Sequence, residues 1–155
     1  YYEPFVGFVP DNHPLSSKTT LEPEDLDVDT MLLLEDGHCF KENILNICKS
    51  SKAKQDQKFK LESGSFDTLI KLAKEGLGMT LLPYLHTLDL TDDKKYLRNF
   101  TNPAPAREVS LVFHKAHLKV QMIEALKSTI DSVVRGAIAF YDVKIISPLP
   151  NKKGA

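Results

Sequence analysis

Hydrophobic residues along the first half of the chain predict strands that alternate with helices. Residues 1–9 are dense in β-forming residues that alternate between two sides, which predicts a strand ending at the proline-containing stretch 11–14. The continuous apolar run 31–34 is typical of a strand buried on both faces. Further expected elements are, in order, a short strand near 59–61, a helix over 65–76, a strand over 78–82, a short helix that begins at Pro83 and a strand over 96–100.

After the apolar run 31–34, the hydrophobic residues recur with the spacing of a helix. Hydrophobic residues from Phe40 to Cys48 recur at intervals of three and four, so we expect a helix over 40–50 whose polar residues, Asn43 and Asn46 among them, face water. The apolar neighbours of Cys48 predict that its thiol is buried when reduced.

Two prolines, Pro103 and Pro105, predict an extended connector between two units of the chain. After it we expect a strand over 109–113, an amphipathic helix over 118–134 that Gly136 closes, and a last strand over 137–146. The apolar face of 118–134 is typical of a core helix, or of a dimer interface.

The alternation of strands and helices predicts an α/β fold with a largely parallel sheet. One sheet is complete before the proline connector, whereas the strand and helix after it belong to a neighbouring unit whose other half is missing. We therefore expect the chain to be a fragment of a larger protein.

Composition narrows the class of protein. The 155 residues are 42% hydrophobic and 26% charged, as in a globular domain. The longest apolar runs are too short to cross a bilayer, and the N-terminus lacks a secretion signal. With a net charge of −1 and dispersed basic residues, no phosphate-binding surface is evident, so we do not expect this segment to hold DNA.

The two cysteines carry the candidate chemistry. Cys39 follows His38 at a strand-to-helix turn, where backbone N–H groups and the helix dipole favour a thiolate. A structural alternative is equally compatible with these residues: His38 caps the turn and Cys39 fills a gap in the core. Nine helical residues to Cys48 rise roughly 13.5 Å, while a disulfide needs Cα atoms within about 7 Å. Pairing would therefore unwind the helix, although spacing does not show that pairing occurs.

The segment 33–39, followed nine residues on by Cys48, resembles the sensing loop of the OxyR family, the peroxide-sensing LysR-type regulators. Three further segments agree, so that the resemblance spans residues 1 to about 134: Glu3-Pro4 through His13-Pro14, 76–83 and 103–107. The Gly-x-Gly-x-Thr-Leu-Leu-Pro segment alone indicates only a LysR-type effector domain, whereas the spaced cysteines indicate OxyR.

The resemblance implies a role for five residues. Cys39 is the peroxidatic thiol, which hydrogen peroxide oxidises to a sulfenic acid, and Cys48 is the resolving thiol. His38 positions the peroxide or the thiolate, Arg107 brings a positive charge towards the thiol pocket, and Thr80 lines the same pocket. The threonines that the family contributes from the first half of its effector domain are absent from this chain, and no metal or cofactor is expected.

The implied fold is the periplasmic-binding-protein-like effector domain, with 1–106 as its second α/β subdomain, 107–135 as the return strand and helix of the first, and 136–155 as a C-terminal extension. The implied protein is a cytoplasmic regulator and not an enzyme. Its partners are hydrogen peroxide, further copies in a homodimer or homotetramer, and DNA through a helix-turn-helix domain outside this chain, and the resemblance allows RNA polymerase as a further partner. No membrane is implied.

Three alternatives remain. A LysR-type effector domain can bind a small-molecule inducer without thiol chemistry. A cysteine-dependent thiol peroxidase or hydrolase would use the same thiol, but no distinctive catalytic acid or oxyanion motif accompanies it. A zinc site made of Cys39, Cys48 and two histidines matches no compact ligand spacing.

Overall fold

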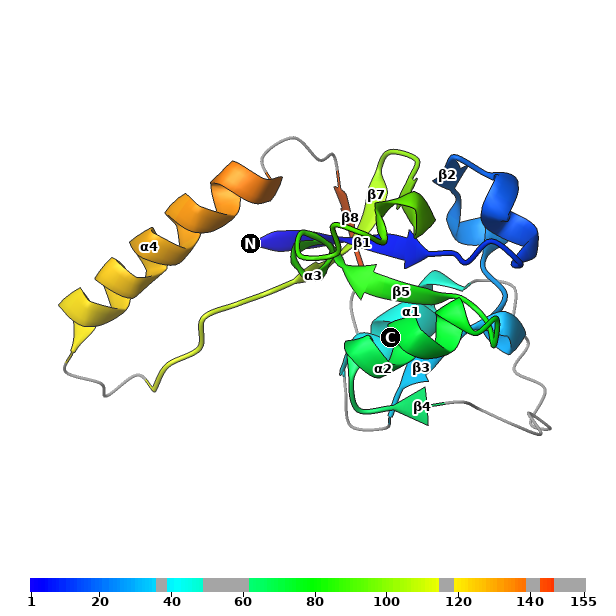
Figure 1. Cartoon of the computed structure of the whole chain (residues 1–155). Coiled ribbons are helices and arrows are strands. Elements are labelled where there is room, and N and C mark those ends of the chain that lie inside the picture. Colours follow the sequence, from blue (N-terminus) through cyan, green and yellow to red (C-terminus); the bar gives the residue numbers. More distant parts are fainter. Residues whose placement is uncertain (36–38, 49–61, 115–118, 139–142, 147–155) are drawn as a thin grey trace.

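A computed structural model describes residues 1–35, 39–48, 62–114, 119–138 and 143–146. Figure 1 shows a packed body around the central strand β1 (Tyr2–Phe8) and a long helix, α4 (Val120–Ile138), that lies to one side of it. Among the described residues, no helix is both long and apolar enough to cross a membrane.

The main sheet is mixed, so the expectation of a largely parallel sheet is wrong. Strand β1 pairs antiparallel with β5 (Thr80–Pro83), β6 (Leu97–Phe100) and β7 (Ala104–Glu108). The parallel pairs lie further out, where β2 (Thr20–Leu21) joins β6 and β8 (Val143–Ile145) joins β7. Hydrophobic alternation marks a strand but not the direction of its partner, which is why the sequence pattern missed this arrangement.

A smaller layer lies beside this sheet. Strands β3 (Leu33–Leu34) and β4 (Glu62–Ser63) pair in parallel, and helices α1 (Cys39–Ile47) and α2 (Phe66–Lys74) belong to the same region of Figure 1. The bridge between Met31 and Met79 links this layer to β5. The remaining helices are short: α3 (Tyr84–Thr87), which begins after Pro83 as expected, and the 3-10 turns η1 (Pro14–Ser17), η2 (Pro23–Asp25), η3 (Val28–Thr30) and η4 (Lys94–Tyr96).

Helix α2 confirms the expected helix over 65–76. It begins after Ser65 and buries Leu69, Ile70 and Ala73 against the core. Gly76 then takes a φ of +83°, a conformation that glycine adopts without strain, and the Leu77 amide donates to the Leu72 carbonyl.

One hydrophobic core joins the two layers. Its largest fully buried side chains come from β1, β2, β3, β5, α1, α2 and the segments between them: Phe5, Phe8, Leu21, Leu26, Leu32, Leu33, Ile44, Ile47, Leu69, Met79, Leu81 and Leu82. Helix α1 therefore packs on the core through its second half, which ends at Ile47, directly before the second cysteine.

The prediction of a strand over 109–113 is wrong, because the strand in this part of the chain is β7, which ends at Glu108. Residues 106–108 find backbone partners on β1 opposite Tyr2–Pro4, and the Val109 amide donates to the Tyr1 carbonyl. Beyond that point, no described strand lies alongside 110–113. Pro105, expected in a connector, instead lies inside β7, where the Ala106 carbonyl next to it accepts the Ile146 amide.

The last two elements differ from expectation at their ends. Helix α4 continues past Gly136 to Ile138, since a glycine costs only about 1 kcal/mol within a helix. Residues 137–138, expected in the last strand, belong to α4, and the described part of that strand is β8, Val143–Ile145. The strand expected near 59–61 lies outside the described residues.

Candidate redox site

The two cysteines lie at opposite ends of helix α1. The helix begins at Cys39, one residue before the predicted start of the helix over 40–50. Its last residue is Ile47, and Cys48 follows directly. The Cys48 amide donates to the Ile44 carbonyl at 3.1 Å and so continues the helical pattern. Over nine residues of helix the backbone rises roughly 13.5 Å, about twice the Cα separation that a disulfide allows. The described fold is therefore one in which this pair is not joined.

Of the two residues His38 and Cys39, the structure describes only the backbone of Cys39. The backbone of Cys39 is placed at the first position of α1, where free N–H groups and the helix dipole stabilise an anion. His38 and the side chain of Cys39 lie outside what the structure describes, so their expected roles stay predictions.

Cys48 is a buried thiol, as expected for the reduced chain. Only 5% of the residue is exposed, and its Sγ–H donates to the Sδ of Met31 at 3.7 Å. Burial raises the pKa of the Cys48 thiol to about 11, and the negative charge of Asp27 adds to the rise. At neutral pH this sulfur is therefore protonated and is a poor nucleophile in its native position.

Asn43 is buried, so the prediction that it faces water is wrong. The residue is 3% exposed, and its Oδ1 has no hydrogen-bond partner among the described residues. Asn43 lies one helical turn after Cys39, which puts the two residues on the same face of α1. That four-residue spacing was the available signal. Asn46, expected on the same polar side, is exposed as predicted.

Arg107 forms an ion pair with a buried carboxylate. It faces Glu3 across the β1–β7 ladder, and its Nε and Nη2 donate to Glu3 Oε2 at 3.0 and 2.8 Å. The other oxygen, Oε1, accepts the Leu85 amide at 2.9 Å, while the Glu3 side chain is only 2% exposed. Part of the charge of Arg107 is therefore compensated by Glu3, and its approach to the thiol stays a prediction.

Thr80 is buried on β5, and its hydroxyl donates to the Leu32 carbonyl at 3.0 Å. The contact ties β5 to the segment that leads into β3. The proton of this hydroxyl is committed to the backbone, so Thr80 could serve a pocket only through its oxygen lone pairs. Its place in the peroxide pocket also stays a prediction.

Comparison with known families and structures decides the class of this domain. The family model described as LysR substrate binding domain matches residues 1–134. The chain belongs to this family. The expected fold class, a periplasmic-binding-protein-like effector domain, is thereby confirmed, and the reduced OxyR regulatory domain from Pseudomonas aeruginosa superposes with a TM-score of 0.70 at 28% identity, over 84% of this chain and 62% of that one.

Several curated relatives of this chain are named as regulators that respond to hydrogen peroxide. A probable hydrogen peroxide-inducible genes activator from Mycobacterium leprae is 34% identical over 117 residues, which are 75% of this chain and 37% of that protein. The DNA-binding transcriptional dual regulator OxyR of Escherichia coli is 29% identical over 135 residues, 83% of this chain and 43% of that protein. The resemblance to the OxyR regulators is thus confirmed, although the chain spans less than half the length of these relatives.

Proposed function

We propose that this chain is the redox-sensing regulatory region of a hydrogen peroxide-responsive LysR-type transcription regulator. The observation that carries the proposal is the placement of two cysteines at the two ends of α1, in a chain related to peroxide-inducible activators. Cys39 is the thiol that peroxide oxidises, and Cys48 is the thiol that then pairs with it.

The chemistry has two balanced steps. The Cys39 thiolate attacks one oxygen of hydrogen peroxide, the O–O bond breaks, and Cys39 becomes a sulfenic acid while hydroxide leaves and is protonated to water. The Cys48 thiol then loses its proton and attacks the Cys39 sulfur, and the sulfenic oxygen leaves with that proton as a second water. Peroxide is reduced by two electrons, and the two thiols supply them.

The second step requires a change of shape. Because α1 holds the two residues at its opposite ends, a bond between them forms only if the helix between them is lost. Helix α1 is nine residues long, and an isolated helix of that length is marginal in water. Its stability therefore rests on the packing of Ile44, Ile47 and Cys48, so α1 is suited to act as the two-state element of the sensor.

The peroxide pocket is proposed to form around Cys39. His38, Arg107 and Thr80 keep the roles that the family resemblance implies, and Asn43, buried one turn after Cys39, offers an amide oxygen that has no hydrogen-bond partner among the described residues. The Glu3 carboxylate that holds Arg107 would fix the orientation of its guanidinium.

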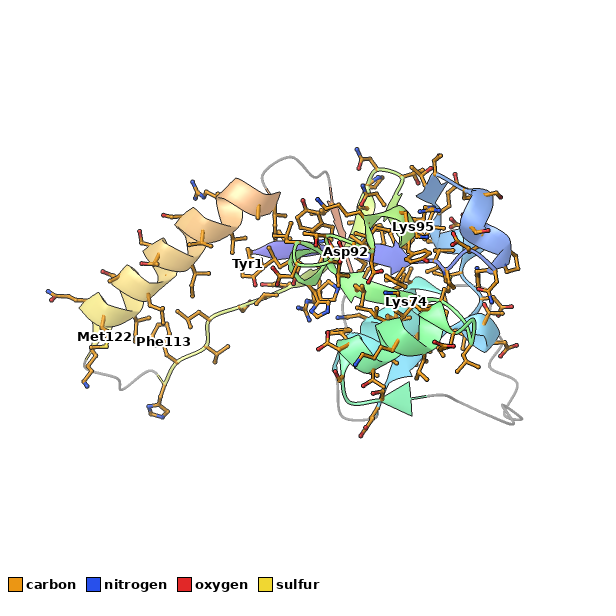
Figure 2. All side chains as sticks on the ribbon, in the orientation of Figure 1. Tyr1, Lys74, Asp92, Lys95, Phe113 and Met122 are labelled. Atoms are coloured by element: carbon orange, nitrogen blue, oxygen red, sulfur yellow. The ribbon has the colours of Figure 1, made fainter. Side chains whose placement is uncertain are left out.

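The parts of the chain are proposed to divide as the family does. Residues 1–106 would form the second subdomain, 107–135 the return into the first, and 136–155 an extension. An open groove of about 730 Å³ between 109–113 and α4 supports this division, because its apolar lining, Val109, Leu111, Phe113, Val120, Ile123 and Ile130, is what a missing half of a domain would cover. Figure 2 shows Phe113 and Met122 on this side, away from the main sheet.

The whole regulator would work in the cytoplasm as a homodimer or homotetramer. It would bind DNA through a separate helix-turn-helix domain and contact RNA polymerase, and the loss of α1 would alter how its subunits pack.

One alternative function, a LysR-type effector domain that binds a small-molecule inducer, is also supported by a relative. The HTH-type transcriptional regulator EstR of Acinetobacter baylyi, whose name does not mention peroxide, is 34% identical over 97 residues, which are 60% of this chain and 31% of that protein. A domain that binds an inducer would need neither cysteine. Its thiols would react with peroxide slowly and equally.

Non-reducing peptide mapping before and after one equivalent of hydrogen peroxide tests the proposal. A linkage between Cys39 and Cys48 should appear only after treatment. Cys39→Ser should abolish it, and Cys48→Ser should leave a sulfenic acid that dimedone traps at Cys39. Slow and equal oxidation of both thiols would reject the peroxide sensor and favour the inducer-binding alternative.

A further inference from the structure

Met31 holds the resolving cysteine by a sulfur–sulfur contact. The Cys48 thiol donates to Met31 Sδ at 3.7 Å, and the two residues are 5% and 7% exposed. Each is also part of the same core cluster, so water does not compete for the thiol proton. Sulfur is a weak acceptor, but it is the partner that the structure gives this buried donor.

The acceptor is fixed on a rigid part of the backbone. Met31 and Met79 form a parallel bridge, in which the Leu32 amide donates to the Met79 carbonyl at 2.8 Å and the Met79 amide donates to the Thr30 carbonyl at 3.1 Å. Strand β5 follows directly after Met79, and β5 pairs with β1 at the centre of the main sheet. Met31 is therefore anchored to the sheet, whereas Cys48 sits at the end of a helix of nine residues.

We infer that Met31 is a positioning residue that retains Cys48 in its buried place and so slows the closure of the disulfide. This inference rests on the proposed function above, which makes Cys48 the resolving thiol. To attack the Cys39 sulfenic acid, the Cys48 sulfur must leave Met31, and the anchored methionine makes that departure less frequent. The peroxide step at Cys39 does not involve Met31, so its rate is independent of this contact.

The contact favours one order of events, in which the sulfenic acid forms before the thiol leaves its methionine, because the contact makes the release of Cys48 from an unoxidised chain less frequent. A chain without the contact would expose Cys48 more often before oxidation and would close its disulfide sooner after it.

The first test uses a chain that has only one thiol. In a Cys39→Ser background, the labelling rate of Cys48 by 4,4′-dithiodipyridine at neutral pH measures how often the thiol leaves its site. Met31→Leu keeps an apolar side chain of similar size but removes the acceptor, and we expect labelling to be about two- to fivefold faster, the range of a weak hydrogen bond. The control, Met79→Leu, makes the same change at the neighbouring buried methionine and should leave the rate within about twofold of the parent. Equal rates in both variants would overturn the inference.

A spectroscopic readout keeps the test valid if either variant loses stability. The S–H stretching band of Cys48 in the Cys39→Ser background reports its acceptor directly. We expect Met31→Leu to shift this band to higher frequency, since the S–H bond loses its partner, and Met79→Leu to leave it in place. An unshifted band in Met31→Leu would overturn the inference.

The two proposals can fail separately. In the chain with both cysteines, stopped-flow measurement should show an unchanged rate of sulfenic acid formation in Met31→Leu and a disulfide step faster by the same factor as the labelling. If labelling responds to Met31→Leu but peroxide gives no 39–48 linkage, Met31 retains Cys48 and the peroxide sensor is rejected. If the linkage forms at the same rate in Met31→Leu as in the parent, the sensor stands and the role of Met31 is rejected.

Discussion

Helices α2 and α4 have the same kind of amphipathic sequence but opposite surroundings. On α2 the apolar residues Leu69, Ile70 and Ala73 are at most 5% exposed, whereas on α4 Met122, Leu126 and Val133 are 50 to 72% exposed. Figure 1 shows why, since α2 lies against the sheets and α4 lies beside them. Hydrophobic spacing thus identifies the face that a helix will bury but not what buries it.

Helix α1 combines features of both. Its second half is buried with the core, as in α2, and its length is too short for independent stability. A helix that depends on its packing loses stability when a packed residue leaves the core, and Cys48 is a packed residue at the end of α1.

Truncation of one leucine on α2 and one on α4 should give the largest difference in the free energy of unfolding. Leu69→Ala removes a side chain that is 1% exposed and should lower the free energy of unfolding by about 2–5 kcal/mol, because a cavity remains in the core. Leu126→Ala, at 50% exposure, should change it by less than about 1 kcal/mol. Urea denaturation of the two variants measures both values, and similar losses would mean that α4 is packed in solution.

Loss of the ion pair between Glu3 and Arg107 should give the next largest change in the free energy of unfolding. Glu3→Gln removes the carboxylate charge that pairs with Arg107, at a side chain that is 2% exposed, and we expect a loss of about 1–3 kcal/mol in the free energy of unfolding. Lys74→Gln, which breaks the ion pair between the exposed Lys74 and the partly exposed Asp93, should lower the free energy of unfolding clearly less. Equal losses would show that the Glu3 pair is no stronger than a surface contact.

The Cys48 thiol predicts a smaller, pH-dependent effect. An unfolded thiol ionises near pH 9, whereas burial holds the pKa of Cys48 at about 11 in the fold. Between these values the unfolded chain binds fewer protons than the native chain, so the free energy of unfolding falls as the pH rises. The fall should be on the order of 1–2 kcal/mol greater than in Cys48→Ala, where this group is absent. Parallel pH profiles would contradict the buried state of the thiol.

Much of the packed body could be predicted from its sequence. The strand in 1–9, the helix over 65–76 and the helix that starts beside Cys39 were expected within a few residues, because hydrophobic spacing there coincides with clear turn residues. The burial of Cys48 was also expected. Its partner was not, because Met31 is seventeen residues away and belongs to a bridge that only the fold creates.

The errors have two physical causes. Residues 109–113 have the composition of a strand but lack a neighbouring strand among the described residues, and Pro105 lies in a strand because its neighbours carry the backbone bonds. Asn43 was assigned to water because its polarity was considered without the packing around it. The errors over 105–113 concern partner strands that are distant in sequence, whereas the error at Asn43 concerns burial that its spacing to Cys39 could have indicated.

The proposed disulfide between Cys39 and Cys48 should remove helix α1. Hydrogen–deuterium exchange of the 39–48 peptide tests it most directly, because the Cys48 amide is bonded to the Ile44 carbonyl in the described fold. Reduced protein should protect this peptide, and protein treated with one equivalent of peroxide should lose that protection while amides of β1 and β5 keep theirs. A confirmed 39–48 linkage with undiminished protection of α1 would contradict the account.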